Sequence, residues 1–193
     1  MKLYWYIYNN CGFFRYVRNF YLYVLKIDWK FQIIALLLIV ILSIIAKLKY
    51  KRRLLGLTQA IAYVVLPVYV FLLFASLVFS RPNTLEININ LSPFWTEKAI
   101  LLGKIKYLKS LIYNLLMLVP WGLLFPVVRK TSFVKTILGG FLISFLIELL
   151  QLMTKTGLCE LDDLIHNTIG VTWGYGIFYM LKLYCNKRVL KVK

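Results

Sequence analysis

Residues 136–181 read TILGGFLISFLIELLQLMTKTGLCELDDLIHNTIGVTWGYGIFYML, in which two apolar runs flank a short polar connector. The runs cover residues 136–153 and 164–181, close to the roughly 20 apolar residues that a helix needs to cross a bilayer. Four of the seven acidic residues of the chain also lie here, between positions 148 and 163. Because carboxylates in or beside membrane spans are costly and usually functional, this stretch is predicted to hold two membrane helices and the functional site.

Three more apolar runs precede this stretch, at residues 31–46, 60–79 and 111–128. The chain of 193 residues is 61% hydrophobic, well above the roughly 45–50% of a soluble domain. The sequence therefore predicts an all-α fold, a polytopic integral membrane helix bundle of four to five transmembrane helices.

Residues 1–46 form a different, N-terminal element. Residues 3–25 are dense in Tyr, Phe and Trp and carry Arg15 and Arg18, a combination that favours the membrane–water interface. We interpret them as an aromatic interfacial helix, with a sixth span as the weaker interpretation, followed by the first span at 31–46. A simple count of alternating spans puts residues 1–30 outside, yet this segment carries several positive charges, which mark cytoplasmic segments. Two alternatives therefore stay open: the run at 31–46 is a half-span, or the aromatic segment also crosses.

Basic residues gather at the ends of the apolar runs. The formal net charge is +17, from 24 Lys and Arg against 7 Asp and Glu. The connectors 47–53 and 129–135 and the tail 183–193 are basic, whereas the connector 154–163 is acidic. Positive charge marks cytoplasmic loops, so the basic segments are predicted to be cytoplasmic and the loops 80–110 and 154–163 to face outside. This placement favours lipid head groups over nucleic acid as the partner.

The topology brings unusual polar residues to the outer side of the membrane. Glu148 and Gln151 are three residues apart and Asp163 and Asn167 are four apart, so each pair shares one helix face. Asn114 lies near the outer start of the span at residues 111–128. We predict a ligand-binding cluster of Asn114, Glu148, Gln151, Asp163 and Asn167, with Glu160, Asp162 and His166 in secondary positions.

Structural roles are the alternatives for these polar residues. Asp162 or Asp163 has the side chain that is preferred for capping the helix that follows. Glu148 needs a partner if it is buried, and outside a site it is expected to hydrogen-bond to Asn114 or Asn167.

Small residues continue the helix face that begins at Asn167. Gly170 and Gly174 follow it at helical spacing. Such stripes commonly let two membrane helices approach closely, so packing is the expected role of these two glycines.

The long outer loop, residues 80–110, has two predicted elements. The alternation in LEININL, residues 85–91, indicates a short extended strand that ends in a Ser-Pro turn. EKAILLGKIKYLK, residues 97–109, is predicted as an amphipathic helix on the membrane surface, with a solvated loop as the alternative. Its lipid-facing residues would be Ala99, Leu102, Ile105 and Leu108.

Four motifs in order resemble the VanZ-like family over residues 60–182. They are NLSPF at 90–94, NLLMLVPWGLLFP at 114–126, ELLQ at 148–151 and ELDDLIHNTIG at 160–170. The chain departs from the family in two places: Gly157 stands where many members have an Arg, and Glu160 replaces the commoner Asp.

The resemblance implies a process of the bacterial cell envelope, in the cell membrane, because the namesake raises resistance to teicoplanin. We predict that the outer cluster binds a lipid head group or a lipid-linked cell-wall precursor and so contributes to glycopeptide tolerance. The alternative is an integral-membrane enzyme that acts on a lipid or isoprenoid phosphate with a carboxylate-bound divalent cation. A small transporter is a third interpretation, and the oligomeric state stays open.

Overall fold

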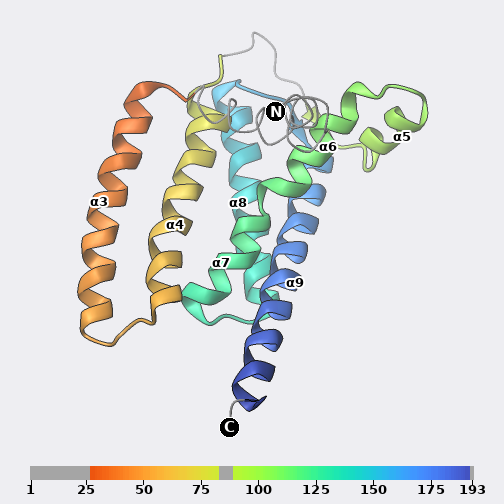
Figure 1. The fold of residues 1–193 in the computed structure, drawn as a ribbon. Helices are drawn as coiled ribbons and strands as arrows, with labels where there is room; N and C mark the ends of the chain where they lie inside the picture. The colour runs from red at the N-terminus through yellow and green to blue at the C-terminus, as the bar shows by residue number, and fades with distance from the viewer. Residues whose placement is uncertain (1–26, 83–88, 192–193) are drawn as a thin grey trace, which may run out of the picture.

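The computed structural model describes residues 27–82 and 89–191, with side chains described up to residue 186. Within these ranges the protein is a helical bundle with one very short pair of strands (Figure 1). The elements are α3 (Trp29–Lys51), α4 (Leu57–Phe74), the π-helix η1 (Ala75–Phe79), β1 (Ile89–Asn90), α5 (Trp95–Leu101), α6 (Lys106–Met117), α7 (Val119–Arg129), α8 (Phe133–Thr154), β2 (Cys159–Glu160) and α9 (Leu161–Lys191). The predicted all-α class is confirmed.

Among the described residues, four helical segments are long and apolar enough to cross a membrane: α3, α4 continued by η1, α6 continued by α7, and α8. The helix α9 runs beside them through the height of the bundle and continues into the predicted basic tail (Figure 1). The predicted four to five spans are therefore confirmed. The first run is longer than predicted, because α3 has 23 residues, which is long enough for a full span. The predicted aromatic interfacial helix lies outside the described residues.

Glycines bring α9 into backbone contact with α6 and α7. A Cβ atom at Gly170 would lie 2.1 Å from the carbonyl oxygen of Leu115, and one at Gly174 equally close to that of Val119. On the facing helix, a Cβ at Gly122 would lie 2.1 Å from the carbonyl oxygen of Val171. Only hydrogen fits in these positions, so the predicted packing role of the glycine stripe is confirmed.

The span made of α6 and α7 is interrupted at Leu118. Pro120 lies in the first turn of α7 and has no N–H, so it cannot continue the hydrogen-bond ladder from α6. The hydroxyl of Tyr69 on α4 donates to the carbonyl oxygen of Met117, which the interruption leaves without a helical partner. Leu118 itself is fully buried and helps to form the core between α4, α8 and α9.

The described part of the loop 80–110 meets the loop 154–163 at one end of the bundle, opposite the basic connectors (Figure 1). We name it the outer end, after its predicted orientation. There β1 and β2 pair in parallel, with Ile89 opposite Cys159 and Asn90 opposite Glu160. Of the predicted strand at 85–91, Ile89 and Asn90 form β1, Leu91 does not continue it, and residues 85–88 lie outside the described residues. The pairing of β1 with β2 ties the two loops together.

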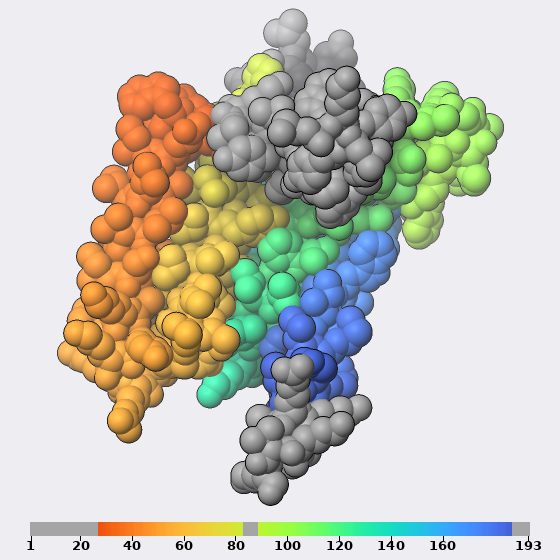
Figure 2. All heavy atoms as spheres, viewed as in Figure 1, coloured from red at the N-terminus to blue at the C-terminus, as the bar shows by residue number. Residues whose placement is uncertain are grey.

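The predicted amphipathic helix at 97–109 is broken by Gly103, whose φ of +83° is a left-handed conformation. It becomes α5, which projects beyond the bundle (Figure 2), and the start of α6. Leu102 and Ile105 are strongly exposed as predicted, but Ala99 is buried. The prediction for Ala99 was wrong because α5 is held against the start of α9, so its helix face turns inward.

Candidate functional site

A cavity of about 810 Å³ opens at the outer end between α4, α6, α8 and α9. All five residues of the predicted cluster line it: Asn114, Glu148, Gln151, Asp163 and Asn167. Glu160, a predicted secondary residue, lines it as well. The structure therefore brings together on one cavity wall side chains from three helices and one loop.

Glu148 closes the outer loop over this wall. It is buried, and its Oε2 accepts a hydrogen bond of 3.0 Å from the backbone N–H of Glu160. A buried carboxylate needs such partners to offset its lost hydration. The alternative expectation, a hydrogen bond between Glu148 and Asn114 or Asn167, was wrong. The amide of Asn114 donates to Asp163, and that of Asn167 donates to Ser144.

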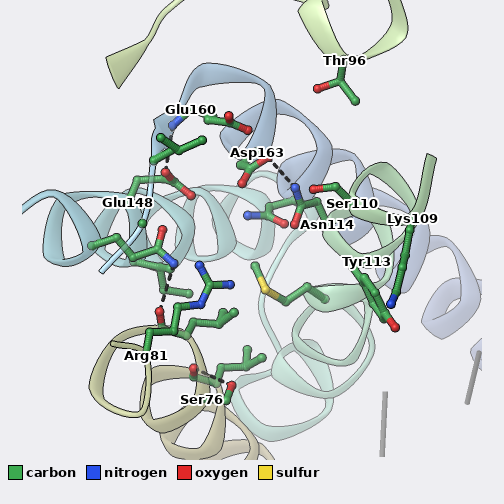
Figure 3. Close-up of a pocket in the computed structure, with 18 of the residues that line it drawn as sticks. Ser76, Arg81, Thr96, Lys109, Ser110, Tyr113, Asn114, Glu148, Glu160 and Asp163 are labelled. Atoms are coloured by element: carbon green, nitrogen blue, oxygen red, sulfur yellow. Dashed lines mark hydrogen bonds between the residues drawn. The ribbon is translucent and has the colours of Figure 1, made fainter. Parts of the chain in front are cut away.

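Asp162 and Asp163, although adjacent, do different work. Asp163 accepts a hydrogen bond from the amide of Asn114, across the gap between α9 and α6 (Figure 3). Asp162 is fully buried and accepts from the backbone N–H groups of Phe94 at 2.6 Å and Thr96 at 2.9 Å. The predicted capping of the helix that follows was wrong, since Asp162 caps the distant helix α5 instead.

Each of the three amide side chains in the cluster donates a hydrogen bond to another group of the protein. Gln151 donates to the carbonyl oxygen of Leu77 at 3.1 Å, and Asn167 donates to the hydroxyl of Ser144 at 2.8 Å. Asn114 donates to Asp163. The Oδ1 of Asn167 is buried and has no hydrogen-bond partner among the described residues. The amides and carboxylates together make this wall rich in hydrogen-bond acceptors.

Arg81 is a charged cavity residue that the sequence analysis did not single out. It follows η1 and approaches the acidic wall from the side of α4 (Figure 3). A Cβ at Gly157 would lie 3.3 Å from its Nη1 and equally close to the Cδ of Gln151. Gly157 therefore leaves space that the guanidinium and the Gln151 amide use.

The remaining cations of the cavity come from α6. Lys106 and Lys109 both line it. The ammonium of Lys109 lies 5.5 Å from the ring centroid of Tyr113, and that of Lys106 lies 4.9 Å from the ring of Tyr107. Such contacts hold lysine heads near aromatic faces without neutralising them.

Deeper in the bundle the cavity wall is apolar. Its members there are Tyr69, Leu72, Leu73, Met117 and Ile147, several of which also belong to the hydrophobic core. The cavity is therefore amphipathic, with polar and charged groups towards the outer end and hydrocarbon below.

His166 does not line the cavity. It is buried, and its Nε2 lies 2.7 Å from the Oε1 of Glu97 on α5. Together with Asp162, this pair holds α5 against α9. The secondary position given to His166 corresponds to a contact between helices and not to a cavity wall.

The loop that carries β2 is electronegative. Burial, and then the nearby Asp162 carboxylate, raise the pKa of Glu160 above its ordinary value. Burial and the carboxylates of Glu148, Asp163 and Glu160 likewise raise the pKa of the Cys159 thiol. Among the described residues, no three His, Cys, Asp or Glu side chains form a group that could hold a metal ion.

The comparisons with known proteins agree with this architecture. The VanZ/LLP1 family model matches residues 60–182, a range that contains every residue of the cavity wall named above. No curated protein and no solved structure matches the chain. The match covers more than half of the sequence, and the chain is a multi-pass membrane protein that belongs to the VanZ/LLP1 family.

Proposed function

We propose that this protein binds the head group of a membrane lipid or of a lipid-linked cell-wall precursor in the outer leaflet of the bacterial cell membrane. The observation that carries the proposal is the amphipathic cavity, whose polar wall lies above an apolar one within a single membrane bundle. An amphiphile in a bilayer has the same division, with its polar part outermost.

The size of the cavity supports this class of ligand. A volume of about 810 Å³ lies within the range of roughly 300–1,000 Å³ that is typical of small-molecule sites. It accommodates a head group and the first part of an acyl or isoprenoid chain. The rest of the chain would remain in the bilayer.

Binding rather than catalysis is the function that the carboxylates favour. Glu148 bonds to the backbone of Glu160, and Asp162 bonds to two N–H groups at the start of α5. Both are occupied in holding the outer loops together. The enzyme alternative has no comparable observation in its favour.

A contribution to glycopeptide tolerance follows from the proposed ligand. Teicoplanin-type lipoglycopeptides act on outward-facing lipid-linked precursors, at the membrane level that we predict for this cavity. A protein that occupies a precursor, or reorganises the lipids around it, would reduce access of the drug.

Glu148→Gln tests the proposal in cells. The variant should lower teicoplanin tolerance towards the level of an empty vector, because the amide changes the charge and hydrogen bonding of the cavity wall. Asp28→Asn, which alters a carboxylate on the exposed cap of α3, is the matched control. Equal membrane levels of both variants must be shown by immunoblotting. Full tolerance in Glu148→Gln at equal levels would refute the proposal.

A further inference from the structure

Two residues of the cavity wall each have a buried polar atom with no hydrogen-bond partner among the described residues. They are the indole N–H of Trp95, which is a donor, and the Oδ1 of Asn167, which is an acceptor. Asn167 is fully buried and donates to the hydroxyl of Ser144, so its oxygen is the part of the amide that is left for a ligand. Unpaired polar atoms in an interior are destabilising, and a ligand that brings both an acceptor and a donor would satisfy the two.

The cations that line the cavity are already engaged within the protein. Arg81 reaches towards the acidic wall (Figure 3), and its positive charge acts on the carboxylates of Glu148 and Asp163. It is thus the counter-ion of that wall. Lys106 and Lys109 each lie over a tyrosine ring. Because the carboxylates repel an anion and the lysines repel a cation, an uncharged ligand fits this cavity best.

Aromatic rings line the same part of the cavity as the unpaired indole N–H. Trp95 on α5 and Tyr107 on α6 pack edge to face, with ring centroids 4.9 Å apart and an interplanar angle of 77°. Such side chains combine a broad apolar surface with one polar group. A sugar ring has the matching division, with C–H groups on its faces and hydroxyls around its rim.

We infer that the head group bound in this cavity is an uncharged sugar, whose hydroxyls accept from the indole of Trp95 and donate to Asn167 and to the carboxylates of the wall. Each hydroxyl is both a donor and an acceptor, so one type of group answers both unpaired atoms. The sugar could be carried by diacylglycerol or by a polyprenyl phosphate, which share this chemistry. The inference rests on the proposed function and adds the chemical class of the head group.

Paired lipids that differ only in the sugar test the inference on the full-length protein in nanodiscs, with occupancy read by native mass spectrometry. One pair is glucosyl diacylglycerol and diacylglycerol, and the other is glucosyl phosphopolyprenol and polyprenyl phosphate. In at least one pair the sugar-bearing lipid should exceed its sugar-free partner by about tenfold, the equivalent of one or two ordinary hydrogen bonds. The pair with the larger difference identifies the carrier. Phosphatidylethanolamine is added as a lipid whose donor is a cationic ammonium.

Two variants test the two unpaired atoms. Trp95→Phe keeps the ring and removes the N–H, and it should reduce the advantage of the sugar-bearing lipid by about threefold or more. Trp173→Phe, on the exposed side of α9, is its control and should not. Asn167→Leu should give a similar reduction, whereas Asn186→Leu on the exposed end of α9 should not. Occupancy by the sugar-free lipid should stay unchanged in all four, which separates a lost hydrogen bond from a damaged fold. Trp95→Phe decides alone if Asn167→Leu does not fold.

The outcomes separate the inference from the proposed function. Equal occupancy within both pairs would refute the inference and leave the proposed function standing. Phosphatidylethanolamine at the level of the preferred sugar-bearing lipid would also overturn it, because the site would then select a cationic donor. An undiminished sugar preference in Trp95→Phe and in folded Asn167→Leu would refute the assigned contacts. Failure of the wild-type protein to retain any of the five lipids would refute the proposed function as well.

Discussion

Between Asn167 and Gly170, in the first third of α9, the molecule changes from an open cavity to tight packing. Below this point Gly170 and Gly174 place the backbone of α9 against the carbonyls of α6 and α7. Above it, Asp163 and Asn167 on the same helix line a cavity of about 810 Å³. The close contact fixes the helix axes, and the separation above it leaves room for polar side chains. The glycine-packed half therefore supports the geometry of the polar half.

The largest expected effect comes from filling the glycine contact. In Gly174→Val the new side chain would overlap the backbone of Val119 and Leu123, neither of which can move without shifting α7. We expect a loss of about 3 kcal/mol or more, the upper end of overpacking effects, measured as thermal unfolding in detergent. Gly176→Val is the control, because nothing lies within 4 Å of a Cβ at Gly176. Equal unfolding temperatures in the two variants would show that the contact is not tight.

The second-largest effect is expected from removing the contact between Asp162 and the start of α5, at the loops of the polar half. Asp162→Ala leaves the N–H groups of Phe94 and Thr96 without their charged acceptor, which should cost about 1.5–3 kcal/mol. The loss is local to α5, so it should appear as faster amide hydrogen exchange over residues 94–101, with slow exchange in α7 and α9 retained. Asp162→Asn keeps one acceptor oxygen and should fall between. Uniform acceleration in all helices would mean that Asp162 supports the whole bundle.

A smaller effect is expected at the second contact of α5. Glu97→Gln keeps a hydrogen-bonding group 2.7 Å from His166, whereas Glu97→Ala removes it. We expect Glu97→Ala to lower the stability of α5 by about 1 kcal/mol, as for an ordinary hydrogen bond, and Glu97→Gln to lower it less. Lys98→Ala, on the exposed side of α5, serves as the control in the same exchange experiment. A larger loss in Lys98→Ala would assign the stability of α5 to its exposed face.

The sequence predicted one half of this comparison better than the other. The spans and the polar cluster follow from local patterns, because hydropathy fixes the helices and a spacing of three or four residues fixes which side chains share a face. Gly170 and Gly174 were recognised in the same way. Asp162 and His166 were misjudged because their partners on α5 lie more than sixty residues away, and no local pattern contains that pairing.

Arg81 shows a second limit of the sequence. An arginine just after an apolar run has the same pattern whether it faces head groups or a cavity. The useful signal was Gly157, which was noted only for a missing family arginine. It is a glycine without a positive φ, so its small size, and not its conformation, is what the neighbouring guanidinium requires. The loop has Gly157 where many family members have an arginine, and Arg81 brings a positive charge to the same cavity from the side of α4.

The smallest expected effect is a pH dependence of the outer loop. Burial and Asp162 raise the pKa of Glu160 in the folded state, so the folded protein binds a proton more tightly there than the unfolded chain does. Stability should therefore be greatest below the ordinary pKa of Glu, and should fall as the pH rises through the raised value. Glu160→Gln should remove this component, seen as hydrogen exchange in residues 155–161 after correction for the intrinsic rate at each pH. Asp162→Asn is the matched control, because the Asp162 carboxylate contributes to the raised pKa of Glu160. It should weaken the pH dependence without abolishing it, because burial is the larger cause of the raised pKa. A wild-type loop that becomes more stable as the pH rises through this range would reverse the sign and show that Glu160 is stabilised as the carboxylate, by a cationic partner on the cavity side.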